Sequence, residues 1–392
     1  MERIDGKTRR SKAGFGFVGA PILRAVRKAR FPLLFAAGLA LCTFAPAATY
    51  QPVSAEKPIP LTFGKSLEIG RQGSIFGTIA SVCEDRDRNI YVLDGAQFTV
   101  FVFSPQGKLI RKFGAKGQGP GDFQSPSQIL IDRQGELVVM EDINFISFFR
   151  TDGTFLRRLD LNGLLGATYV GPDRFLGWTW TPDSRQQVLV DGKNRVLVKL
   201  GSQPRSSFST TMPDATGRAV MFNYSSPDYV PELISAPGER MAVVGFGGAY
   251  RLTIIDGDGN TAGAVSRDIE PGKISSKERA FLEGQIRDTA KERNWPPAVT
   301  KEISKKIPST KPFFRAVRIS PNAVWVFRVK DDITRPDAPF PVDLFSLKGE
   351  YLGSTGVGRI PIFISASRMY FVETDESDAE YVRAAEYGLE LR

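Results

Sequence analysis

A stretch of this sequence occurs twice. Residues 83–113 align with residues 130–158 at an offset of 47, which matches Asp85 with Asp132. Each copy consists of short apolar segments separated by tight turns. A repeat of this length that is built only from strands is typical of a β-propeller blade. The sequence therefore predicts an all-β fold made of repeated blades.

Five hairpin signatures, each with a glycine in the turn, indicate five blades. A glycine there can supply the positive φ that a tight hairpin needs. The turn glycines are Gly107, Gly153, Gly192, Gly259 and Gly349. A sixth blade is expected from the C-terminal strands, which lack an outermost partner, and we expect Ser66–Gly70 to supply it. Residues 66–392 should therefore form a six-bladed β-propeller that is closed by the N-terminal strand.

One segment, residues 269–312, breaks the strand rhythm between blades 4 and 5. Ser275 and Glu278 have the spacing of a capping box, and the residues that follow place Phe281 and Ile286 on one helical stripe with other apolar side chains. A second short helix is expected over Ala298–Ile307. We therefore predict a small helical insertion, with Phe281 and Ile286 facing the propeller.

The segment Phe113–Asp142 resembles an NHL repeat, and the whole body resembles a six-bladed NHL-type propeller of exported bacterial proteins. The resemblance is specific over residues 79–160 and rests on strand rhythm elsewhere. It implies a disc with a central channel and loops on two faces. Members of this group include scaffolds, ligand-binding modules and a few enzymes. The best-known lyase among them uses zinc held by histidine, which this chain cannot do.

Composition excludes several kinds of chemistry. The chain contains no histidine, which removes Ser-His-Asp hydrolysis and histidine-ligated metals. Its two cysteines are Cys42 and Cys83, and only Cys83 is expected in the mature chain, so no internal disulfide is predicted. Residues 1–48 hold nine Lys or Arg and two Asp or Glu, whereas the remainder holds 43 and 41. The nearly neutral body gives no electrostatic footprint for nucleic acid.

The basic bias belongs to a targeting segment. Basic residues precede the apolar run Phe31–Ala48, whose length suits a secretory signal peptide. Residues 1–48 are therefore interpreted as a signal peptide or an N-terminal anchor, followed by a Pro-rich linker over residues 49–65. The body is expected to be periplasmic or extracellular, with membrane contact only through a possible anchor at residues 31–48.

The sequence carries no catalytic signature, and no metal or cofactor is expected. We predict a non-catalytic binding or scaffold module that recognises a protein, peptide or glycan through propeller-face loops. The candidate binding residues lie on the insertion and are Arg279, Arg287, Lys291 and Trp295. The alternative is a calcium-dependent, lactonase-like or other hydrolase with a site in the central channel. Its candidate ligands would be Asp85, Asn89 and Asp132. A purely structural, membrane-tethered scaffold is a third interpretation.

Overall fold

The computed structural model describes residues 56–390, except 74, 181–183, 205–208, 214–217, 225–232 and 239–240. The targeting segment at residues 1–48 and residues 49–55 of the linker lie outside the described residues. In the part of the chain that is described, no helix is long and apolar enough to cross a membrane.

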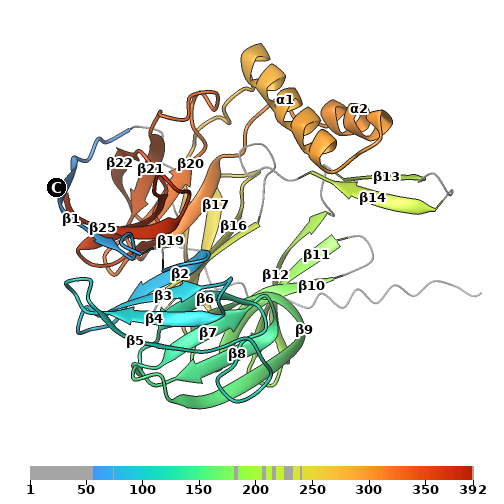
Figure 1. Cartoon of the computed structure of the whole chain (residues 1–392). Helices are drawn as coiled ribbons and strands as arrows, with labels where there is room; N and C mark the ends of the chain where they lie inside the picture. Colours follow the sequence, from blue (N-terminus) through green and yellow to red (C-terminus); the bar gives the residue numbers. More distant parts are fainter. Residues whose placement is uncertain are drawn as a thin grey trace, which may run out of the picture. The chain divides into compact units, whose positions relative to one another are not determined.

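Six four-stranded blades build the fold (Figure 1). Blades 1 and 2 contain β2 (Ile79–Glu84), β3 (Ile90–Asp94), β4 (Thr99–Phe103), β5 (Leu109–Phe113), β6 (Pro126–Ile131), β7 (Leu137–Glu141), β8 (Ile143–Phe149) and β9 (Phe155–Gly171). Blades 3 and 4 add β10 (Arg174–Trp180), β11 (Ser184–Asp191), β12 (Val196–Pro204), β15 (Leu233–Pro237), β16 (Met241–Phe246), β17 (Arg251–Asp256) and β18 (Thr261–Ser266). Blades 5 and 6 add β19 (Phe314–Ile319), β20 (Val324–Arg328), β21 (Phe340–Phe345), β22 (Tyr351–Val357), β23 (Phe363–Ile364), β24 (Arg368–Thr374), β25 (Glu380–Leu389) and β1 (Leu61–Ile69).

The blades close into a ring through their innermost strands. Strand β2 contacts β6 on one side and β23 on the other, while β15 contacts β9 and β19, and β19 contacts β23. Strand β1 completes blade 6 by antiparallel pairing with β25, from Leu61 opposite Leu389 to Ile69 opposite Val382. The predicted closure by the N-terminal strand is therefore confirmed. The strand begins at Leu61 rather than Ser66, so it takes in the last residues of the segment that we had assigned to the linker.

Blades 2 and 3 share one strand. The 17 residues of β9 pair with β8 near their start and with β10 near their end, so a single seven-stranded sheet runs from β6 to β12. The chain passes from the outside of blade 2 to the inside of blade 3 without a turn, which no repeat in the sequence indicated.

Apolar side chains pack between neighbouring blades. Phe76, Phe101 and Phe103 of blade 1 join Tyr370 and Val382 of blade 6 in one buried cluster. A second cluster joins blade 1 to blade 2 through the buried faces of β3, β4, β6 and β7. These buried faces between neighbouring blades form the core of the ring.

Four of the five predicted turn glycines have positive φ, as expected. At Gly349, for example, φ is +93° and a Cβ would lie 2.2 Å from the carbonyl oxygen of Ala264, so only glycine fits. The prediction for Gly192 is wrong. In that hairpin the left-handed residue is Asn194, with φ of 59°, because asparagine tolerates this conformation better than most side chains.

The insertion between blades 4 and 5 contains α1 (Ser276–Glu292) and α2 (Pro297–Lys305). Ser275 caps α1 and forms the predicted capping box with Glu278. Both helices pack on a hairpin that the sequence analysis did not predict, formed by β13 (Ser209–Pro213) and β14 (Ala219–Asn223). The apolar cluster of this subdomain contains Tyr224, Leu282, Ile286, Val299, Ile303 and Ile307.

The prediction that Phe281 faces inward is wrong. Phe281 is 41% exposed. Ile286 is fully buried, but its apolar neighbours are those of the cluster between the helices and the hairpin of β13 and β14. The buried stripe of α1 is set by Leu282, Ile286 and Ala290 at four-residue spacing. Phe281 precedes Leu282 by one residue and is therefore turned by about 100° away from that stripe.

Candidate functional site

A groove of about 800 Å³ runs between α1 and α2. Its lining residues are Arg279, Glu283, Arg287, Ala290, Lys291, Asn294, Trp295, Pro297, Thr300, Lys301, Ser304 and Lys305. All four candidate binding residues from the sequence lie in this set, because α1 presents one polar face at helical spacing and Trp295 follows its end. Lys301 and Lys305 of α2 face the same groove, although the sequence analysis did not single them out.

The four candidate residues differ in the contacts that they already make within the fold. Arg279 donates hydrogen bonds to the carbonyl oxygens of Ile307 (3.2 Å) and Pro308 (3.1 Å), which ties α1 to the chain just beyond α2. Trp295 is partly buried, and its ring meets Phe222 of β14 edge-on at 6.0 Å. These two residues therefore hold the groove together as well as lining it.

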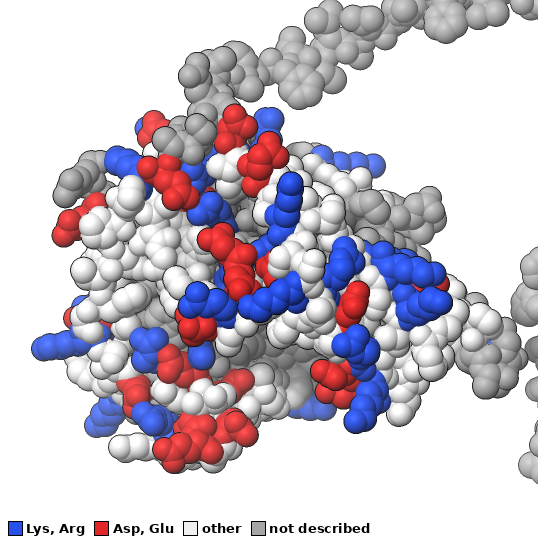
Figure 2. Space-filling model, turned by 90° about the horizontal axis from the view of Figure 1, so that it is seen from above, with Lys and Arg blue, Asp and Glu red and all other residues white. Residues whose placement is uncertain are grey.

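Arg287 and Lys291 are exposed, as predicted. Neither they nor Lys301 form a salt bridge to any residue that the structure describes, whereas Lys305 pairs with Glu302 at 2.6 Å. Glu283 is the one carboxylate among the groove residues given above. Figure 2 views the molecule from above, where the insertion lies in Figure 1, and lysine and arginine side chains gather there with carboxylates between them. The groove therefore carries an excess of positive charge.

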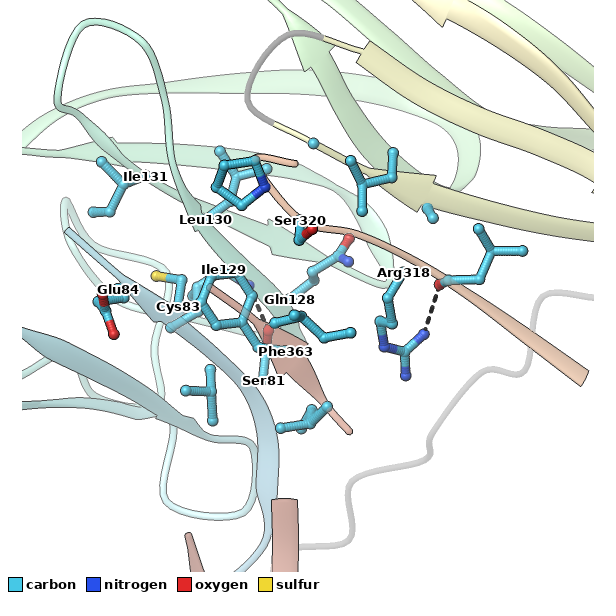
Figure 3. A pocket seen from close by; sticks show the side chains of 18 of the residues that line it. Ser81, Cys83, Glu84, Gln128, Ile129, Leu130, Ile131, Arg318, Ser320 and Phe363 are labelled. Carbon is cyan, nitrogen blue, oxygen red and sulfur yellow. Dashed lines mark hydrogen bonds between the residues drawn. The ribbon is translucent and has the colours of Figure 1, made fainter. Parts of the chain in front are cut away.

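A second cavity, of about 670 Å³, lies inside the ring. Its walls come from the innermost strands β2, β6, β15, β19 and β23 and the loops that follow them, so it is the central channel of the propeller. Ser81, Cys83, Glu84, Gln128 and Arg318 supply much of its polar surface (Figure 3). Burial raises the pKa of the Cys83 thiol well above its ordinary value, so this cysteine is not a reactive thiolate.

The carboxylates proposed for a calcium-dependent hydrolase do not line this cavity. Asp85 accepts hydrogen bonds from the backbone amide (2.8 Å) and the side-chain amide (2.9 Å) of Asn89, and from the hydroxyl of Tyr91 (3.0 Å). These bonds stabilise a hairpin turn within blade 1, so the pair Asp85 and Asn89 serves the fold.

Asp132 occupies the equivalent turn of blade 2. It accepts from the backbone amides of Gln134 and Glu136, both at 2.9 Å, and from the hydroxyl of Tyr169 at 3.3 Å. Burial raises the pKa of Asp132 even though the two amides act in the opposite direction. Among the described residues, no three acidic or cysteine side chains come together as a metal site would require.

The comparisons with known proteins agree with a propeller. Residues 72–182 match the DUF5128 family model, described as a 6-bladed beta-propeller. No curated protein matches the chain. These residues contain blades 1 and 2 and the first strand pair of blade 3, so the match covers the part of the chain where the sequence repeat is clearest.

Several solved structures are similar at low identity. A putative exported protein from Bacteroides fragilis is 12% identical, with a TM-score of 0.49, and the alignment covers 86% of this chain and 98% of that one. A member of the DUF4221 family from Bacteroides vulgatus is 10% identical, with a TM-score of 0.48 and coverage of 86% and 100%. Virginiamycin B lyase from Staphylococcus aureus is 8% identical, with a TM-score of 0.39 and coverage of 83% and 98%.

Proposed function

We propose that this protein is an exported, non-catalytic binding module, and that the groove between α1 and α2 receives its partner. Export is supported by the basic and apolar pattern of residues 1–48. The resemblance of Phe113–Asp142 to the NHL repeat supports a propeller of that type, a group in which binding modules are common.

The observation that carries the proposal is the charge of the groove. Arg287, Lys291 and Lys301 are exposed and form no salt bridge to a described residue, and Trp295 adds an aromatic surface beside them. Exposed cations beside a partly buried aromatic ring are the composition that interfaces use to recognise acidic partners. Of the protein, peptide and glycan partners considered from the sequence, the groove favours an acidic segment of a polypeptide.

Binding of a fluorescent glutamate-rich peptide, followed by anisotropy at low salt, tests this proposal. Replacing both Arg287 and Lys291 with alanine should weaken binding roughly three- to tenfold, because each exposed charge contributes up to about 1 kcal/mol. The matched control replaces Lys108 and Lys112, two exposed lysines of blade 1, and should leave binding unchanged. Equal loss in the two double variants would contradict the groove as the site. Preferential binding of a uronic-acid polymer would instead favour a glycan partner.

A calcium titration separates the module from the hydrolase interpretation. The proposed module should melt at the same temperature with and without calcium. A rise in Tm with calcium concentration would favour a channel-bound ion, because a ligand that binds only the folded state stabilises it.

A further inference from the structure

Arg318 carries a charge that the channel does not neutralise. Its side chain leaves β19 and enters the cavity wall, where Nε donates to the carbonyl oxygen of Pro361 at 2.9 Å and Nη1 donates to that of Val317 at 3.0 Å. Both acceptors are neutral backbone groups. The two hydrogen bonds therefore fix the orientation of the guanidinium without compensating its positive charge.

The carboxylate on the cavity wall is engaged elsewhere. Glu84 accepts a hydrogen bond from the hydroxyl of Tyr370 and lies 3.9 Å from Nε of Arg88. In Figure 3, Glu84 and Arg318 lie on opposite sides of the cavity. Burial lowers the pKa of the Arg318 guanidinium to about 10, so it remains charged at neutral pH. No described carboxylate lies within salt-bridge distance of it.

Apolar side chains line a large part of the remaining wall. The apolar side chains that line it include Ile129, Leu130, Ile131, Ile319, Ile362 and Phe363. A volume of about 670 Å³ lies within the range of small-molecule sites, which are mostly apolar with a few fixed polar groups. A single oriented cation in such a cavity selects a ligand with one negative charge and an apolar body.

We propose that the central channel binds a small organic carboxylate, with its charged end on Arg318 and its apolar body against Ile362, Phe363 and their neighbours. A monoanion matches the single positive charge. A phosphate dianion would bring a second negative charge into an apolar cavity without a partner, which is costly. This site is separate from the groove on the insertion and does not depend on it.

The probe for this site is 4-phenylbutyrate, compared with acetate and with the neutral amide 4-phenylbutyramide. At millimolar concentration, 4-phenylbutyrate should raise the Tm of the full protein, and acetate and the amide should raise it much less. Calorimetric titration should then give an affinity for 4-phenylbutyrate that falls roughly 10- to 100-fold in Arg318→Met, the loss expected for one charge-assisted hydrogen-bonded contact. Arg318→Lys keeps the charge and should retain part of the affinity.

The control is the double replacement of Arg287 and Lys291 by alanine, which should leave 4-phenylbutyrate binding unchanged. This control separates the channel site from the groove. The three ligands are first compared on the unaltered protein, so the test holds even if Arg318→Met does not fold. Absence of stabilisation by 4-phenylbutyrate would overturn the proposal. Equal stabilisation by acetate, by the amide, or in Arg318→Met would overturn it as well.

Discussion

At the scale of single residues, acidic side chains stabilise this fold by accepting hydrogen bonds inside it. Asp343 of β21 is fully buried and accepts from Arg267 Nη1 at 2.9 Å, Tyr250 hydroxyl at 2.6 Å and Ser354 hydroxyl at 2.8 Å. Because Arg267 and Tyr250 belong to blade 4 and Asp343 to blade 5, this network joins two blades. The paired charges have no exposed side-chain surface.

Replacing Asp343 with asparagine should therefore destabilise the protein strongly. The change removes the counter-charge of a buried arginine, and breaking a buried ion pair costs about 3–5 kcal/mol. Chemical denaturation measures the effect. Asp337→Asn is the control, because Asp337 is 75% exposed in its pair with Arg335 and should cost less than about 1 kcal/mol. Similar losses in the two variants would show that the network contributes little.

Glu278 supplies a pH-dependent link between the insertion and blade 5. It lies 2.6 Å from the ammonium of Lys311 and accepts from the backbone amides of Ser275 (2.8 Å) and Ile333 (3.3 Å). Burial alone would raise the pKa of Glu278, but these partners outweigh it, and the pKa lies below its usual 4.5. The ionised group therefore stabilises the fold above pH 4.5, and this contribution is lost as pH falls through the lowered pKa.

The expected result concerns the difference in Tm between the unaltered protein and Glu278→Gln. That difference should be largest near neutral pH and should shrink once the pH drops below about 4.5. Thermal melting at a series of pH values gives the measurement. A difference that stays constant down to pH 3 would assign the stabilisation to packing rather than to charge.

At the scale of helices and strands, the sequence predicted those elements that are determined by residues close together in the chain. The capping box at Ser275 and the four-residue spacing of Leu282, Ile286 and Ala290 were sufficient to locate α1. The hairpin of β13 and β14 could not be located, because its short strands pack on helices that follow some 60 residues later. In the same way, the groove residues of α1 could be chosen from helical periodicity, whereas Lys301 depends on how α2 packs against α1.

The role that we propose for Arg318 could not be predicted from the sequence. One arginine on a short strand has no local signature, since its proposed role depends on its having no salt bridge to any described carboxylate, including Glu84 on the distant strand β2. Asp85 and Asp132 occupy one repeat position, and in the structure both stabilise turns.

Replacing residues 275–306 with a short Gly/Ser linker should leave the propeller folded but loosen the hairpin of β13 and β14. The deletion removes the apolar partners of Phe222 and Tyr224, while the blades keep their own clusters. Combined with Lys311→Met, which avoids leaving a buried ammonium, it should shift Tm by less than about 5 °C. Limited proteolysis should cut within residues 209–224 in this variant and not in the unaltered protein. Equal resistance of the hairpin would show that it folds without the helices.

At the scale of the whole molecule, the hairpin signatures and the C-terminal strands predicted the number of blades and the closure by the N-terminal strand. They did not predict β9, because Asn162, Gly163 and Gly166 within it resemble turn residues, and both glycines do have positive φ although the strand continues through them. Nor did they place the start of β1, since residues 62–65 are all exposed and lack a clear alternating pattern.

Removal of β1 should open the ring. A chain that begins at Arg71 lacks the partner of β25 and loses the burial of Ile69, which alone contributes roughly 1.5–3 kcal/mol. We expect a clearly lower Tm by circular dichroism and some dimerisation through the exposed strand edge. A chain that begins at Glu56 keeps β1 and should melt like the full protein. Identical melting of the two shortened chains would contradict closure as a source of stability.

The pairing of Leu61 with Leu389 also determines when the fold can be finished. The chain emerges with its N-terminal end first, and 328 residues separate these partners. Synthesis proceeds at about 5–20 residues per second, so roughly 15 to 65 s pass between the synthesis of β1 and that of β25. Pairing over that separation also carries the entropy cost of closing a long loop. During this interval the backbone of β1 lacks its partner β25, although Ile69 already has Phe76 and Phe101 of blade 1 to pack against. The growing chain therefore presents an unpaired strand edge to chaperones and to other nascent chains.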